Sequence, residues 1–528
     1  MMQLNIATKQ PLFCNGEFVL KKFKIDNIHF FSTIILLFLL LFQQYAYNMD
    51  ARNWMHGEFD GTSFDATSAQ FATGTMEAGQ NGLHLPGYGL SKIERLTVIQ
   101  ENSEQWKDEF KSDKLYNDDC TLPVVYDRYI ETYVQGGKMI VLQTQAGEVY
   151  RLQDSIINEK DETCFLIFDK PCEELRSQQE LEACLVFNEN GEILPYAVAK
   201  PYRKQFGLQG KIYYHTARLT SAETAFNIFT AATSFMMALT VMLICAVLHK
   251  KYSNIKLTAA FYIVFWLSPW VSAFAQHLYW VEFLWFIPML LGLLYITFPK
   301  LKYLWFALIF LAVAVKSLCG FEYISTVLMS MVLFPIAEFF EVRDKKQKFI
   351  IFKDVAIMTV ISLVAFGVGF VVLANSRGAG DIMEGIRIII QDDAVRRTGL
   401  ANPEDFTGVL QEAAEVSFVT ALSKYLTFTT DIITFVSGKL FPVIIVLSAA
   451  GLVISVIRKE KYSVSCIVIM LFSFLASNSW LTILARPHSW CHTHLNYVLW
   501  YFGFVQICVY GVIALISFIP TLFRKTSK

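Results

Sequence analysis

The chain is 528 residues long, and 54% of its residues are hydrophobic, 15% aromatic and only 17% charged. One soluble core could not bury so much apolar surface, so the composition excludes a soluble globular protein and predicts a polytopic membrane protein. The formal net charge of -1 identifies no partner, because the placement of charges matters more in a membrane protein, and nothing indicates nucleic acid.

The first apolar segment has the properties of an uncleaved membrane anchor. Residues 1–27 are polar and end with Lys21, Lys22 and Lys24, just before an apolar run at 28–47 that is long enough to cross a bilayer of about 30 Å. A cleaved signal peptide is disfavoured, because QQYAYNMD lacks the small residues that a signal peptidase needs. The lysines place the N-terminus in the cytoplasm.

Residues 48–222 form a polar first loop. Its middle, at about 120–205, contains short alternating runs separated by turn signals such as QGGK and NENG, which predict a small β-rich domain. This domain is either an acceptor- or carbohydrate-binding module or a structural lid. Its four cysteines, which show no zinc-ligand spacing, either form one disulfide or stay as buried thiols; they are Cys120, Cys164, Cys172 and Cys184.

The rest of the chain is a succession of apolar segments. They predict nine further spans, at 226–248, 257–275, 279–297, 301–317, 322–340, 354–374, 434–457, 463–484 and 497–520. Alternating sides then place every short basic loop in the cytoplasm, as the positive-inside rule requires. The predicted fold is a mainly α polytopic membrane helix bundle of about ten spans with a small extracytoplasmic β-rich domain after the first span.

The predicted organisation has two long outer loops. It consists of a cytoplasmic segment at 1–27, a first span at 28–47, an outer loop at 48–222, spans two to seven at 223–374, a second outer loop at 375–433, and the last three spans with a cytoplasmic tail at 434–528. Any chemistry is expected on the outer face, where the polar loops gather.

Acidic residues follow the first span directly. Asp50 lies at the membrane boundary, where partial desolvation raises the proton affinity of a carboxylate. It suits a general base or a ligand for a divalent cation, although it could also simply begin a solvated loop. Glu58 and Asp60, like Asp65, are weaker candidates, because loop carboxylates are usually solvated.

Two outer turns place ionisable residues beside apolar runs. In AVAVKSLCGFEYIS, Lys316 and Glu322 either pair with each other or line a polar cavity in which Lys316 contacts a lipid phosphate. The turn AQHLYWVEFLW offers a substrate pocket, or alternatively an interfacial aromatic belt; its polar and aromatic residues are His277, Tyr279, Trp280 and Glu282. Glu282 is expected below the surface, where it would hold a cation or act on substrate.

The second outer loop carries arginines on the side of the membrane that is poor in basic loops. These are candidates for a phosphate clamp, since the guanidinium fork matches phosphate oxygens; they are Arg377, Arg387, Arg396 and Arg397. The alternative is a surface network in which nearby carboxylates neutralise them, namely Asp392, Asp393, Glu404 and Asp405.

The last outer turn, ARPHSWCHTHLNY, adds Arg486, His488 and Asn496 as candidates for the substrate pocket. His492 and His494 could share a metal on a strand or turn but would diverge on a helix. Hydrogen bonding to substrate or to another outer loop is therefore favoured over a metal site.

A single first span, a large outer loop that opens with acidic residues, and a second long outer loop between the seventh and eighth spans resemble the GT-C-type membrane glycosyltransferases, which use polyprenyl-phosphate-linked sugars. The resemblance implies that Asp50 is the catalytic base or a metal ligand, and that the lipid phosphate is held by Lys316 or by arginines of the second outer loop. There is no DxD pair in the first loop and no WWD motif, which disfavours the oligosaccharyltransferase branch.

The expected activity is therefore transfer of a sugar, with inversion, from a polyprenyl-phosphate carrier to a glycan, lipid or protein acceptor on the outer face of a membrane, expected to be a bacterial plasma membrane. A divalent cation is the one cofactor that the acidic segment could bind. A polysaccharide or lipid transporter and a non-enzymatic export or assembly protein are the alternatives.

Overall fold

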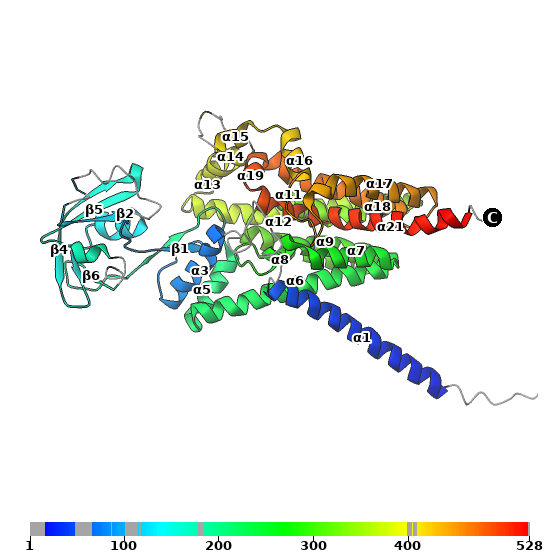
Figure 1. The fold of residues 1–528 in the computed structure, drawn as a ribbon, viewed down its shortest axis with the longest axis horizontal. Coiled ribbons are helices and arrows are strands. Elements are labelled where there is room, and N and C mark those ends of the chain that lie inside the picture. Colours follow the sequence, from blue (N-terminus) through cyan, green and yellow to red (C-terminus); the bar gives the residue numbers. More distant parts are fainter. Residues whose placement is uncertain are drawn as a thin grey trace, which may run out of the picture.

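The structure is a computed structural model that describes residues 16–47, 66–85, 87–100, 114–115, 118–177, 181, 183–398, 404 and 409–525. Figure 1 shows a bundle of long helices with a small sheet region at one end. The long helices are α1 (Gly16–Tyr47), α6 (Ala222–Tyr252), α10 (Lys302–Cys319), α11 (Ile324–Glu341), α12 (Lys345–Arg377), α17 (Phe441–Ile457), α18 (Ser463–Asn478) and α21 (Phe504–Lys525). The bundle confirms a mainly helical protein with apolar helices suited to a membrane.

Six helical segments of the described chain are long and apolar enough to cross a membrane, and up to eight if each of two bent pairs is one span. One pair joins α7 (Ile255–Leu267) to α8 (Pro269–Ala275) at 63°. Pro269 cannot donate a backbone hydrogen bond, and the Ser268 hydroxyl instead accepts one from Val271 N, which begins a new helix.

The second bent pair joins Thr493–Tyr501 to Phe504–Ile519 at 56°, with Gly503 at φ 109° in the break. The other two predicted spans correspond to the shorter apolar helices Ser32–Tyr47, within α1, and α9 (Phe283–Thr297). The structure thus supports six to eight spans, a coarser result than the ten predicted from the sequence.

The small sheet region lies in the first long loop. Five antiparallel strands follow the order β2 (Thr121–Val125), β5 (Thr163–Phe168), β4 (Val149–Asn158), β3 (Val141–Gln143) and β6 (Leu185–Phe187). Leu122, Leu166 and Val186 belong to its buried core. Cys120, Cys164 and Cys172 are free thiols, so the structure favours thiols over a disulfide among these three.

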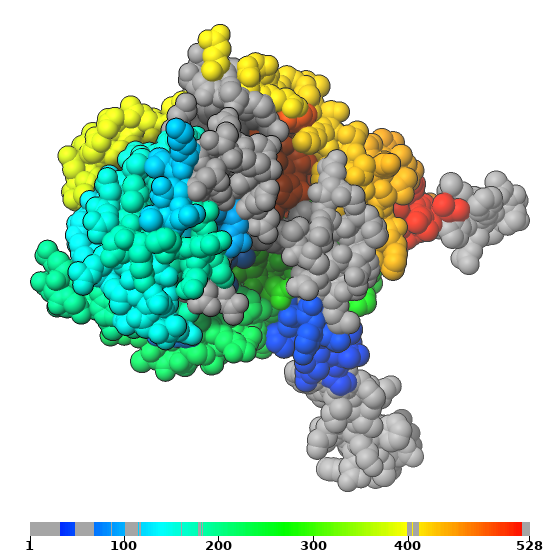
Figure 2. Space-filling view, turned by 60° about the vertical axis from the view of Figure 1, so that its left-hand side comes forward, coloured from blue at the N-terminus to red at the C-terminus, as the bar shows by residue number. Residues whose placement is uncertain are grey.

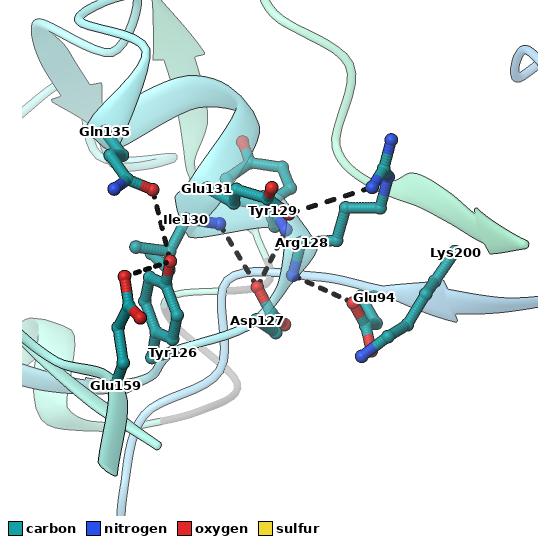
Figure 3. A network of polar contacts seen from close by, with 10 residues as sticks. All are labelled: Glu94, Tyr126, Asp127, Arg128, Tyr129, Ile130, Glu131, Gln135, Glu159 and Lys200. Carbon is teal, nitrogen blue, oxygen red and sulfur yellow. Dashed lines mark hydrogen bonds and ion pairs between the residues drawn. The ribbon is translucent and has the colours of Figure 1, made fainter. Parts of the chain in front are cut away.

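A two-stranded ribbon connects the sheet region to the bundle. It pairs β1 (Ser91–Glu94) with β7 (Val198–Pro201), and Figure 3 shows how polar contacts hold it to the helical turn that leads into η3 (Ile130–Gln135). Glu94 accepts from Arg128 N at 2.9 Å and from Lys200 Nζ at 2.8 Å, whereas Asp127 accepts from Tyr129 N at 2.8 Å. Both carboxylates therefore satisfy backbone or cationic donors at the start of one helix.

Two short helices, α3 (Ala66–Gln80) and α5 (Leu208–Leu219), pack between the ribbon and the bundle. Their contact requires glycine: a Cβ on Gly79 would lie 2.2 Å from the Tyr214 carbonyl oxygen. The remaining helices, α13 (Ile382–Ile389), α14 (Val395–Thr398), α15 (Val409–Glu415), α16 (Phe418–Leu426), α19 (Arg486–Cys491) and α20 (Thr493–Asn496), are short and belong to the second long loop and the last turn.

Ion pairs join neighbouring helices at one end of the bundle. Lys251 of α6 lies 2.9 Å from Glu338 of α11, and Lys302 of α10 lies 3.3 Å from Asp354 of α12. Asp354 also accepts a hydrogen bond from Tyr295 at 2.8 Å. These pairs gather at the end of the bundle from which the predicted basic loops leave.

Candidate functional site

The end of α10 opposite the ion pairs contains a buried lysine. Lys316 is only 2% exposed, and its Nζ donates to the Gly320 carbonyl oxygen at 2.7 Å. A cation in the last helical turn is favoured by the helix dipole and satisfies a carbonyl that has no partner within the helix. The local sequence thus folds so that Lys316 closes its own helix.

Glu322 lies in the turn that follows and does not form an ion pair with Lys316 among the described residues. Its carboxylate is 6% exposed, and the Tyr279 hydroxyl lies 3.4 Å from its Oε1 and 3.1 Å from the Tyr202 hydroxyl. A Cβ on Gly320 would come within 2.5 Å of Glu322 Oε2, so only glycine leaves room for this carboxylate. Of the two alternatives left open by the sequence, the direct pairing of Lys316 with Glu322 is thus not seen: the two side chains have separate hydrogen-bond partners in one polar cluster.

Arg397 of α14 is the loop arginine that approaches this cluster. Burial alone would lower the pKa of its guanidinium, but the negative charges of Glu322 and Asp393 more than compensate and raise that pKa. Its Nε is buried and has no hydrogen-bond partner among the described residues. We call the set of Lys316, Glu322, Tyr279, Tyr202 and Arg397 the polar centre.

The other loop arginines lie elsewhere or are neutralised. Arg377 forms ion pairs with Asp392, at 2.9 Å, and with Asp393, which also lies 3.5 Å from Lys204. Arg387 is exposed and pairs with Glu384 at 2.5 Å on its own helix. The surface network that was the alternative to a phosphate clamp thus accounts for Arg377, whereas Arg387 is neutralised by a carboxylate outside that predicted network. The side chain of Arg396 lies outside the described residues.

Glu282 is the second buried carboxyl at this end. It is 0% exposed, and neither carboxylate oxygen has a hydrogen-bond partner among the described residues. It lies near Tyr45 in the last turn of α1, whose hydroxyl donates to the Phe265 carbonyl oxygen at 3.0 Å. An unsatisfied buried carboxyl costs several kcal/mol unless it is neutral or meets a ligand, so this position requires a chemical explanation.

The aromatic residues of the same turn pack inside the bundle. The rings of Trp280 and Tyr323 stack at 5.5 Å between centroids, and Trp480 packs on Tyr323 at 5.8 Å. Trp280 is 8% exposed and His277 is 9% exposed. The Trp280 ring also lies 4.8 Å from the ring of Tyr279, so this aromatic cluster packs next to Glu322 and its tyrosine partner and does not form an exposed interfacial belt.

Helix α19, in the turn that follows α18, packs against α14, which carries Arg397. Asn496 is fully buried beside Tyr425, and Arg486 is half-buried. The His488 and His492 rings lie 4.7 Å apart, and those of His492 and His494 lie 5.9 Å apart. No group of three or more His, Cys, Asp or Glu side chains in the described ranges has the arrangement of a metal site.

The linker before α5 was not selected from the sequence as part of the site. Tyr202 contributes its hydroxyl to the polar centre, and the Gln205 side chain lies beside Gly320, whose Cβ would come within 2.3 Å of Gln205 Oε1. Gln209 Nε2 donates to the Tyr279 and Cys319 carbonyl oxygens at 3.0 and 3.2 Å. The signal that could have found the two glutamines is the spacing of Gln205 and Gln209 around Gly207 in the linker before the second apolar span.

The acidic segment after the first span, with Asp50, Glu58, Asp60 and Asp65, lies outside the described residues. The described end of α1, which precedes this segment, lies beside α8: Gln44 Nε2 donates to the Ser272 hydroxyl at 3.3 Å. Figure 2 looks onto this end of the protein, where red-brown atoms are visible in depth next to the yellow and orange segment that follows α12.

Comparison with protein-family models, with curated proteins and with solved structures finds no match for this chain. The functional argument therefore depends on the geometry of the polar centre: a buried lysine, a half-buried arginine and a carboxylate that accepts from a tyrosine hydroxyl, with a second, unsatisfied carboxyl at the same end of a membrane helix bundle.

Proposed function

We propose that the protein is a membrane glycosyltransferase that moves a sugar from a polyprenyl-phosphate carrier to a glycan, lipid or protein acceptor. The observation that carries the proposal is the polar centre, in which Lys316 and Arg397 bring positive charge to the end of an apolar bundle. A lipid-linked phosphate would offset the cost of desolvating these two cations, because it carries anionic oxygens on an apolar chain.

The proposed topology has ten crossings and places both termini in the cytoplasm. The shortest crossings are α9 and the apolar part of α1, Ser32–Tyr47. The basic loops at the end fastened by the Lys251–Glu338 and Lys302–Asp354 ion pairs support a cytoplasmic position for that end. The polar centre and the sheet region then face the extracytoplasmic side, where a lipid-linked donor would meet its acceptor.

In the proposed reaction an acceptor hydroxyl oxygen attacks the anomeric carbon of the donor sugar. The bond from that carbon to the phosphate oxygen breaks, and the carrier phosphate departs with the electron pair, stabilised by Arg397 and Lys316. A carboxylate takes the proton of the acceptor hydroxyl. Asp50 is the expected base, and the unsatisfied Glu282 is the described carboxyl that could contact the acceptor. Attack opposite the leaving phosphate inverts the anomeric centre.

The experiment is to incubate the purified full chain with a panel of polyprenyl-phosphate sugars and acceptors, and to measure released carrier phosphate and glycosylated acceptor. We expect transfer by the wild type, a large loss in Arg397→Gln, and little change in Arg387→Gln, a matched control whose guanidinium is exposed and paired on its own helix. Equal activity of both variants would refute the role of the polar centre, and absence of transfer from the whole panel would refute the proposed function.

A lipid or polysaccharide transporter is the second candidate, because broken membrane helices line the substrate sites of many transporters. The two bends adjoin in this protein: Trp270 of α8 packs on Tyr497 at 5.0 Å. The charges of the polar centre lie at helix ends and not at these bends, which favours the transferase. Reconstituted vesicles that move a lipid-linked glycan across the bilayer without releasing carrier phosphate would support the transporter.

A further inference from the structure

A groove lies on the far side of α3 from the polar centre. It has a volume of about 490 Å³ and is lined by α3 residues together with Asn81, Arg95 and the first turns of α6. The α3 residues that line it are Thr73, Met76, Glu77 and Gln80, which share one face of the helix. Phe71 on another face packs on Tyr202 of the polar centre at 4.2 Å, so α3 separates the two sites by about one helix diameter of roughly 10 Å.

A second cavity continues the groove toward the sheet region. It measures about 200 Å³ and shares Glu77 and Arg95 with the first, adding Tyr129 and Tyr196. Arg95 and Glu77 form an ion pair, the Arg95 guanidinium lies 5.4 Å from the centre of the Tyr196 ring, and the Tyr196 hydroxyl donates to Glu77 at 3.1 Å. The Tyr129 hydroxyl is buried without a hydrogen-bond partner among the described residues.

The groove presents hydrogen-bonding groups of both kinds. Gln80 Oε1 accepts from Ala222 N at 2.7 Å, which leaves its amide donors, and Asn81 Nδ2 donates to the Glu77 carbonyl oxygen at 2.9 Å, which leaves its Oδ1 acceptor. Tyr196 is 45% exposed and Phe226 is 40% exposed, so each offers part of an aromatic surface. Sugar hydroxyls both donate and accept, and the C–H face of a pyranose packs on aromatic rings.

The charged side chains of the groove narrow the class of ligand that it could bind. The groove contains two carboxylates, Glu77 and Glu223, against one guanidinium, Arg95, so it disfavours an anionic polymer or a lipid phosphate. We propose that this groove binds a neutral glycan chain. Its role, which rests on the proposed function, is to hold a segment of the acceptor at a distance of a few sugar units from the site of transfer.

Binding is tested on the full chain in lipid nanodiscs, without donor, using fluorescent hexamers of N-acetylglucosamine and of glucose as probes. We expect saturable binding of at least one hexamer, weakened about tenfold or more by Tyr196→Ala and by Gln80→Leu. The matched control is Tyr303→Ala, which removes a tyrosine that is 76% exposed at the start of α10, far along the chain from the groove. It should bind as the wild type does.

Two results would overturn the proposal: neither hexamer binds at millimolar concentration, or binding is the same in wild type, Tyr196→Ala and Gln80→Leu. In the transfer assay these groove variants should raise the KM for acceptor. If a hexamer binds in the groove but no donor supports sugar transfer, only the proposed function is refuted. If the protein transfers sugar but both groove variants bind the hexamers as the wild type does, only the glycan-binding groove is refuted.

Discussion

The interaction between Glu322 and Arg397 can be measured by a double-mutant cycle made from Glu322→Gln, Arg397→Gln and the double variant. Glu322 is 6% exposed, and its charge together with that of Asp393 raises the pKa of the Arg397 guanidinium against the effect of burial. Each single variant removes one partner of this charge pair and leaves the other charge in place, whereas the double variant removes both charges. We therefore expect a coupling free energy on the order of 1 to 3 kcal/mol.

The assay is unfolding of the purified protein in mixed micelles by titration with a denaturing detergent, followed by tryptophan fluorescence. The matched control cycle uses Glu384 and Arg387, which lie only 2.5 Å apart but have side chains 42% and 57% exposed. Water and salt screen an exposed pair, so its coupling should be smaller despite the short distance. A coupling for Glu322 and Arg397 below about 0.5 kcal/mol, or no larger than that of the control, would refute the polar centre as an electrostatic unit.

Three further outcomes are expected. Gly320→Ala should destabilise the protein by about 1 to 3 kcal/mol in the same unfolding assay, because its Cβ would meet Gln205 and Glu322, whereas Gly367→Ala, which faces open space, should not. Glu282→Gln should reduce sugar transfer without loss of stability; wild-type transfer would exclude a catalytic role. Burial raises the pKa of Asp127 from 3.8 to about 7, so between these pH values the folded sheet region binds a proton that the unfolded chain has lost. The free energy of unfolding of the sheet region should therefore fall as the pH rises from about 4 to about 7. Unfolding measured at a series of pH values should show this fall in the wild type but not in Asp127→Asn.

The helix bundle could be predicted because hydropathy reports apolar length directly. What hydropathy could not predict is where a span breaks. The segments 257–275 and 497–520 have the composition of continuous helices, yet Pro269 and Gly503 lie at bends of 63° and 56°. Whether such a residue kinks a helix or starts a new one depends on partners elsewhere in the chain, such as Asp431, whose carbonyl oxygen accepts from Trp270 Nε1 at 3.3 Å.

The polar centre was partly predictable for a different reason. A charge beside an apolar run is costly, so Lys316 and Glu322 stand out in the sequence whatever their partners are. Arginines in a polar loop carry no such signal: the sequence treats Arg377 and Arg397 alike, whereas in the structure the first is neutralised by Asp392 and Asp393 and the second approaches Glu322. Tyr202 was missed because a tyrosine in a polar linker is unremarkable until the fold places it against Tyr279.

The energetic cost of the polar centre is itself an argument for function. Lys316 has a compensating carbonyl, and Glu322 has a tyrosine hydroxyl, but the carboxyl of Glu282 has no partner among the described residues. Buried ion pairs seldom stabilise a fold more than apolar residues of the same volume would, and an unsatisfied carboxyl destabilises it. Three buried ionisable side chains, those of Lys316, Glu322 and Glu282, thus lie at one end of the bundle, whereas ion pairs such as Lys251–Glu338 join helices at the other end. This arrangement fits a site that a charged ligand completes better than it fits a structural role.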